Sequence, residues 1–89
     1  MSAILFETVK NDRLAMSVAQ ALAIANVAAM ERGRDPSESL VTITEDIAGA
    51  GRVWRIQYGP RDYIARRGGD LIVLVDEQSG TIQQILRGQ

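Results

Sequence analysis

The second half of the chain most constrains the fold, because strand-like runs and turn signals alternate along it. Apolar or aromatic residues occupy every second position of 53–58 (VWRIQY), which is typical of a half-buried strand. Two further apolar runs, 71–75 and 81–86, are separated by a polar stretch that ends in Gly80. Gly80 can supply the positive φ of a type I turn followed by a bulge, so these two runs predict an antiparallel hairpin.

One long helix is predicted over 11–33. Asn11 or Asp12 is the expected N-cap, and Gly33 suits the position just after the helix end. The first apolar stripe follows helical spacing and should cover the sheet; it consists of Leu14, Val18, Ala21, Leu22, Ala25 and Ala29. The second stripe exceeds what one sheet face can bury; it consists of Met16, Ala23, Val27 and Met30, with Ile24 beside it.

Three environments could accommodate the second stripe. A membrane span is disfavoured, because 14–30 is Ala-rich and shorter than the ~20 residues that a span needs. A cleaved signal peptide is disfavoured, because acidic residues stand where a positive region belongs. Burial against protein is favoured: either residues 2–10 fold back over the helix, or a second copy packs there, giving a homodimer through Ala23 and Val27.

The remaining pattern completes the predicted sheet. A first strand is expected at 40–45 and a turn at 47–51. The strand that contains Trp54 should end at Pro60, which cannot donate to a ladder. The chain is therefore expected to be a single domain over 1–89, with an N-terminal segment (1–10), a helix (11–33) and an antiparallel sheet of three or four strands (40–87). This order predicts an α+β, two-layer fold with the helix on one sheet face.

The predicted core lies between the helix and the sheet. Trp54 and Tyr58 point to the same strand face with Ile56 between them, so this face is expected to lie under the helix. At 89 residues without Cys, the domain depends on this core rather than on disulfides. The expected core residues are Leu14, Val18, Leu22, Val41, Ile43, Trp54, Ile56, Val73, Val75 and Ile82.

Composition disfavours catalysis. The chain has no Cys and no His, which removes thiol nucleophiles, imidazole bases and the usual transition-metal ligands. Neighbouring acids such as Glu45 and Asp46 point to opposite faces of a strand and make no acid–base pair. We therefore predict no enzyme activity, no cofactor and no metal. The absence of Cys fits a cytoplasmic location, and a net charge of −1 disfavours a nucleic-acid partner.

Charges are unevenly distributed along the chain. Four acids and no base lie within 35–46, whereas 52–67 holds five Arg residues and one acid. One interpretation is that adjacent strands pair opposite charges across their solvent face. The other is that the basic strand pair meets an acidic patch on a partner, where Arg favours bidentate contacts.

A partner-binding surface is predicted around the basic segment. Tyr63 is flanked by arginines and is expected to be exposed, and protein interfaces concentrate aromatic and Arg residues at their centre. The predicted surface consists of Tyr58, Arg61, Tyr63, Arg66 and Arg67.

A resemblance to known proteins is carried by this same half of the chain. The matching residues are Trp54-Arg55-Ile56-Gln57-Tyr58, Tyr63-Ile64, Gly69, Ile72-Val73-Leu74-Val75-Asp76 and Ser79-Gly80-Thr81-Ile82. Over 53–86 they resemble small bacterial immunity proteins of polymorphic toxin systems, in particular the immunity protein 35 family, with the NTF2-fold immunity proteins as a second match.

The resemblance implies a cystatin-like or NTF2-like two-layer fold and the neutralisation of a cognate toxin by direct binding. It transfers no catalytic residue. Two other functions stay open: a homodimeric structural or accessory interaction domain, and a nucleic-acid-binding module. The residues leave the toxin's identity open, and also whether the complex forms in cytoplasm or periplasm.

Overall fold

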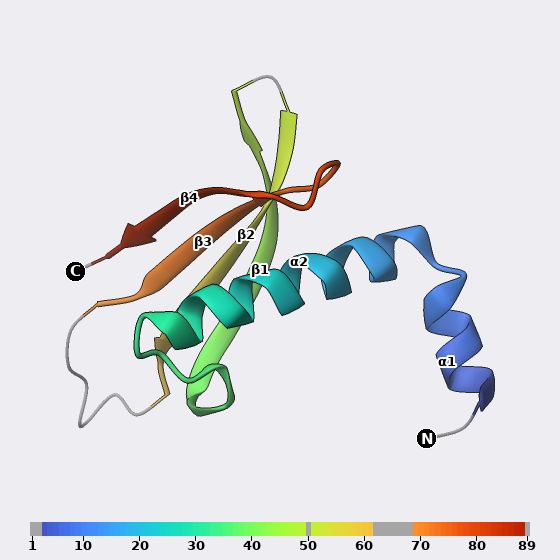
Figure 1. Ribbon diagram of the computed structural model, residues 1–89, viewed down its shortest axis with the longest axis horizontal. Helices are drawn as coiled ribbons and strands as arrows, with labels where there is room; N and C mark the ends of the chain where they lie inside the picture. The colour runs from blue at the N-terminus through green and yellow to red at the C-terminus, as the bar shows by residue number, and fades with distance from the viewer. Residues whose placement is uncertain (1–2, 50, 62–68, 89) are drawn as a thin grey trace.

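A four-stranded antiparallel sheet with one long helix across it forms the body of the molecule (Figure 1). The structure is a computed structural model that describes residues 3–49, 51–61 and 69–88, with side chains from residue 7 onward. Its elements are α1 (Ala3–Lys10), α2 (Arg13–Glu31), the 3-10 helix η1 (Pro36–Glu38), β1 (Ser39–Ala48), β2 (Gly51–Pro60), β3 (Leu71–Asp76) and β4 (Ile82–Arg87). The predicted α+β fold is confirmed.

The strands form a simple meander in the order β1-β2-β3-β4. β1 and β2 pair along their whole length, from Ser39 opposite Pro60 to Ala48 opposite Gly51. The turn predicted at 47–51 is therefore tighter, because the strands continue to a two-residue connection that begins at Gly49 with φ +63°. β2 ends at Pro60, as its missing N–H predicts.

The β3–β4 hairpin has the geometry that its sequence predicts. Gly80 adopts φ +72°, and its N–H donates to the carbonyl of Asp76 at 2.9 Å. The Asp76 carboxylate accepts from the backbone N–H groups of Gln78 and Ser79 at 2.8 and 2.9 Å. The register shifts between Leu74 and Val75, so a bulge distorts the pairing of β4.

Both ends of α2 are capped by local sequence. Asp12 is the N-cap, and its carboxylate accepts from Ala15 N–H at 3.0 Å. At the other end Gly33 adopts φ +79° and donates to the carbonyl of Met30 at 3.1 Å, while Arg34 N–H donates to that of Ala29 at 2.9 Å. This pair of bonds is the Schellman motif, so the helix boundaries follow from residues beside them.

Alanines let α2 approach the sheet closely. Ala21, Ala25 and Ala29 recur at every fourth position and are buried against β3 and β2. Their small side chains leave room for the large ones of the strands; the buried cluster also contains Trp54, Ile56, Tyr58, Leu71, Val73 and Val75, with Val18, Leu22, Ile43 and Ile85 packed against it.

Two polar residues of α2 fix its position along β2. Trp54 Nε1 donates to Ser17 Oγ at 2.8 Å, and Tyr58 Oη donates to Asn26 Oδ1 at 2.7 Å. The helix covers about 14 Å between its two residues at ~1.5 Å per residue, and the strand covers about 13 Å at ~3.3 Å per residue. Helix and strand therefore match in length between these two contacts.

Three residues of the predicted core are in fact exposed. Leu14 is 62% exposed, because it lies in the first turn of α2, where the helix extends beyond the sheet (Figure 1). Val41 and Ile82 are 38% and 37% exposed, because they lie on the two edge strands. The core prediction is wrong at these three positions and omits Val53 and Leu71, which are fully buried.

The N-terminal segment forms α1, which the sequence did not predict. α1 contacts α2 near its beginning and lies apart from the sheet (Figure 1). It does not fold back along α2, so Ala23, Val27 and Met30 of the second stripe are exposed. Met16 and Ile24 of that stripe are half-buried.

Candidate functional site

The predicted partner surface is divided by the structure. Tyr58 is fully buried beneath α2, so its side chain does not form part of an exposed surface. Burial raises the pKa of its hydroxyl to about 12, which keeps it a neutral hydrogen-bond donor to Asn26. Arg61 is exposed, whereas Tyr63, Arg66 and Arg67 lie outside the described residues.

The residues that flank 62–68 both lie near the C-terminal end of α2. Arg61 Nη2 donates to the carbonyl of Ser39 at 2.9 Å, and Ser39 Oγ donates to the carbonyl of Asp35 at 2.8 Å. On the other side, Arg34 Nη2 donates to the carbonyl of Gly69 at 2.6 Å. The start and the end of the basic segment are therefore both tied to the chain that follows α2.

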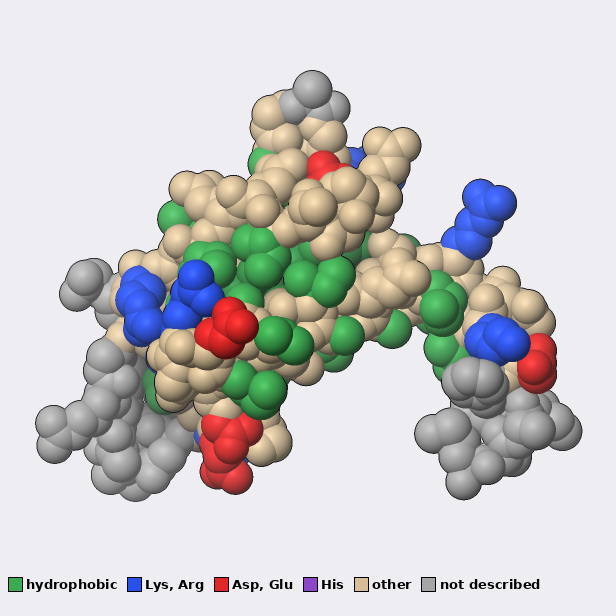
Figure 2. Space-filling view, viewed as in Figure 1, with side chains coloured by type: hydrophobic (Ala, Val, Ile, Leu, Met, Phe, Trp, Pro, Cys, Tyr) green, Lys and Arg blue, Asp and Glu red, His purple; other side chains and the backbone are tan. Residues whose placement is uncertain are grey.

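Further arginines gather at this end of the molecule. Arg32 Nη1 donates to the carbonyl of Ala28 at 3.1 Å, and Arg87 Nη2 from the end of β4 donates to the carbonyl of Arg32 at 3.4 Å. Figure 2 shows basic side chains side by side where α2 and β4 end. Sequence reasoning missed Arg32, Arg34 and Arg87 as a group, because Arg87 is distant in the chain from the other two and only the fold brings it beside them.

Exposed apolar side chains adjoin these arginines. Val27 and Met30, in the last turns of α2, are 53% and 58% exposed. Green side chains follow α2 in Figure 2, and an acidic side chain lies between them and the basic ones. At this helix end Arg32 Nη1 lies 3.9 Å from Glu31 Oε1. We call the set Val27, Met30, Arg32, Arg34, Arg61 and Arg87 the α2-end surface. An apolar centre with an arginine rim is a composition that protein interfaces favour.

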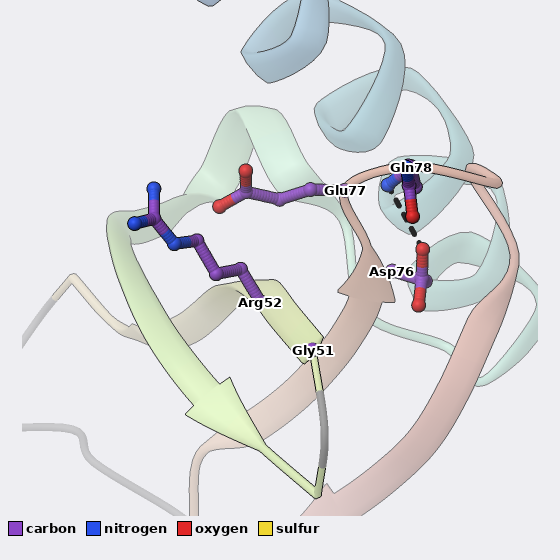
Figure 3. A pocket seen from close by; sticks show the side chains of 5 residues that line it. All are labelled: Gly51, Arg52, Asp76, Glu77 and Gln78. Atoms are coloured by element: carbon purple, nitrogen blue, oxygen red, sulfur yellow. Dashed lines mark hydrogen bonds between the residues drawn. The ribbon is translucent and has the colours of Figure 1, made fainter.

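A shallow pocket lies at the opposite end of the strands. It has a volume of about 270 Å³ and is lined by Gly51, Arg52, Asp76, Glu77 and Gln78. In Figure 3 the side chains of Arg52 and Glu77 extend toward each other across it. Arg52 Nη1 lies 3.6 Å from Glu45 Oε2, so one pair of opposite charges does bridge β1 and β2, as one interpretation of the charge pattern predicted.

Glu77 has an unusual electrostatic environment. Its pKa is raised, first because its carboxyl shares a hydrogen bond with that of Glu45, then through desolvation and the negative charge of Glu45. Its Oε2 is shielded from solvent and has no hydrogen-bond partner among the described residues. Asp76 differs: backbone N–H groups of Ser79 and Gln78 lower its pKa.

The pocket offers no evident catalytic constellation. Within the described ranges, no group of three or more Asp, Glu, His or Cys residues is placed to hold a metal ion. The Asp76 carboxylate is occupied by its own turn, and Arg52 is exposed. The pocket can contribute a pH-dependent charge, and the α2-end surface can contribute contact area.

By length and a mean hydropathy of 1.4, α2 could cross a membrane. A core helix meets the same criteria, and α2 packs three alanines and two hydrogen-bonded side chains against the sheet. No family model matches the chain, and neither a curated protein nor a solved structure matches it. The resemblance to immunity proteins therefore stays a prediction from residues 53–86.

Proposed function

We propose that this chain is an immunity protein, which binds a cognate bacterial toxin and neutralises it by occluding the toxin's functional surface. The observation that carries the proposal is the α2-end surface. Exposed Val27 and Met30 lie in the last turns of α2, Arg34 lines a hollow together with Met30, and Arg87 from the end of β4 donates to the carbonyl of Arg32. The sequence resemblance over 53–86 supplies the kind of partner.

The composition of this surface favours a protein partner. Apolar side chains give contact area that gains from leaving water, and arginines make bidentate contacts to carboxylates. An acidic patch on the toxin is the complementary surface. Tyr63, Arg66 and Arg67 remain part of the surface predicted from the sequence and lie outside the described residues. We place the complex in the cytoplasm of the producing cell.

The test combines protection with direct binding. Cells that express the toxin encoded beside this chain also express either the native chain or the Val27→Asp/Met30→Asp variant. Calorimetry measures the affinity of the toxin for each of the two chains. The double variant should raise Kd by about a hundredfold if each side chain contributes about 1.4 kcal/mol, and protection should fail. Tyr63→Ala/Arg66→Glu tests the basic segment in the same assay.

Leu14→Asp is the matched control. Leu14 is equally exposed on α2 but lies at its other end, so the change should leave both affinity and protection intact. Full protection by the Val27→Asp/Met30→Asp variant would remove the α2-end surface from the interface. Failure of the native chain to bind or protect would remove the immunity function itself.

A structural role as a homodimeric accessory domain is the second candidate. The exposure of Ala23 and Val27 favours it, because small and apolar residues on one helix face allow two helices to approach closely. Ala23→Glu should then convert a dimer to a monomer in light scattering. An unchanged mass would exclude this helix-mediated dimer.

A further inference from the structure

The two edges of the sheet differ in their protection against pairing. β4 has six residues, a disturbed register and Arg87 at its end, three features that discourage the addition of another strand. β1 has ten residues in unbroken register with β2 and contains no Pro, Lys or Arg. No strand of the described chain pairs with its other edge. The charged residues of β1 are Glu45 and Asp46, and Arg61 donates to the carbonyl of Ser39 at its start. Between these points a long edge in regular register is a template for a further strand.

The side of β1 that faces the helix layer is covered only around Ile43, which is half-buried. The larger contacts of α2 with the sheet are those with β3 and β2. Val41 and Ile47, which point to this side, are 38% and 75% exposed. An added strand would therefore find apolar side chains beside the free backbone groups.

The free backbone groups belong to alternate residues. Ala48 and Gly51 flank the two-residue connection and lie opposite each other. The backbone N–H and C=O groups of Ala48, and of every second residue before it, therefore point toward β2. Ile47 N–H accordingly donates to the Asp46 carboxylate at 2.8 Å rather than to β2. By alternation, Val41, Ile43 and Glu45 direct their N–H and C=O groups to the open edge.

We propose that a second copy of this chain pairs with β1 in antiparallel orientation, with Thr44 opposite Thr44 across a two-fold axis. The sheet then continues through both copies. This register places Val41 opposite Ile47 of the second copy and Ile43 opposite Glu45 of the second copy, each twice. On pairing, the N–H of Ile47 exchanges the Asp46 carboxylate for the carbonyl of Val41 of the second copy. The interface is isologous, as in most homodimers.

Charge and polarity select this register. A shift that centres Glu45 on the axis sets two like charges directly opposite, which is destabilising. A shift that centres Ile43 pairs Ile47 with Ser39 and Val41 with Glu45, so it keeps one apolar pair, Ile43 with Ile43, in place of two. The strand is thus complementary to itself in length and side chains, which favours a second copy over a foreign strand.

A single cysteine tests the register directly, because the chain contains none. In the proposed dimer Thr44 forms a non-hydrogen-bonded pair, whose Cα atoms lie ~4.5 Å apart and within disulfide range. Thr44→Cys should form a disulfide-linked dimer under mild oxidation at micromolar concentration. Gln84→Cys on β4 and Ala23→Cys on α2 are the matched controls and should stay unlinked.

The unmodified chain should sediment as a dimer. Val41→Pro removes an N–H that points to the open edge, so it should give a folded monomer with unchanged circular dichroism. A native chain that is monomeric throughout the micromolar range, or a disulfide at Ala23→Cys but not at Thr44→Cys, would overturn the proposal. The result is independent of toxin binding, since the α2-end surface and the β1 edge share no residue.

Discussion

At the scale of single residues, the pairing of Ser17 and Asn26 with two aromatic side chains decides how α2 lies on the sheet. Apolar contacts alone are not directional, and an alanine-rich helix could slide along the strands. A buried hydroxyl or indole N–H without a partner is costly, so the two bonds at 2.8 and 2.7 Å select one position. The polar residues within an otherwise apolar helix therefore determine its register.

Asn26→Ala should lower the free energy of unfolding by about 1–3 kcal/mol, because the buried hydroxyl of Tyr58 loses its acceptor. Urea denaturation measures the change. In Tyr58→Phe, which has no hydroxyl, Asn26→Ala should cost clearly less. Equal costs in both backgrounds would show that the hydrogen bond does not stabilise the fold.

At the scale of elements, the last residue of β3 and the first residue after it carry carboxyl groups whose pKa values shift in opposite directions. Asp76 is stabilised as a carboxylate by its turn, whereas Glu77 is driven toward its neutral form by Glu45 and by desolvation. A raised pKa in the folded state means that the folded chain binds the proton more tightly than the unfolded chain does. The contribution of Glu77 is therefore present at low pH and is lost as pH rises from its ordinary pKa through the raised value.

The Glu77→Gln variant should have a higher melting temperature than the native chain at pH 7. The difference between the two melting temperatures should be smaller at pH 4. Thermal unfolding across this range measures it. Asp76→Asn is the opposing control: its contribution exists above the ordinary carboxyl pKa and is lost as pH falls through the lowered value, so this change should destabilise at pH 7. A native-like pH profile for Glu77→Gln would contradict the raised pKa of Glu77.

At the scale of the whole molecule, stability is concentrated where α2 crosses the two central strands. β2 and β3 are each paired with a strand on both sides and hold most of the buried side chains. The larger contacts of α1 are with α2 and not with the sheet. Local opening costs least where few apolar contacts are buried. The molecule should therefore open from α1 inward.

Amide hydrogen exchange should show this gradient. The slowest amides should lie in β2, β3 and the middle of α2, at the free energy of global unfolding, and those of α1 should exchange fastest. A truncated chain that lacks residues 1–10 should keep its melting temperature within the few degrees that correspond to about 1 kcal/mol. Slow exchange throughout α1 would show a docking that the structure does not contain.

Much of the local structure followed from the sequence by itself. Asp12, Gly33, Pro60 and Gly80 act on backbone groups a few residues away, so the ends of α2, the end of β2 and the second hairpin could be predicted. The alternation in 53–58 likewise placed Trp54 and Tyr58 on the buried face. α1 escaped prediction because a short helix is marginal alone, and its contact with α2 is tertiary.

The candidate site depended on the tertiary structure. Tyr58 looks suited to an interface beside arginines, yet the position of α2 buries it, and that same position leaves Leu14 and Val41 exposed. Arg32, Arg34 and Arg87 converge only because β4 ends beside the C-terminus of α2. Sequence patterns report which residues share a face of an element, because that is set by local geometry. Which face is covered, and which strand becomes an edge, depends on contacts between distant segments, and these only the folded molecule decides.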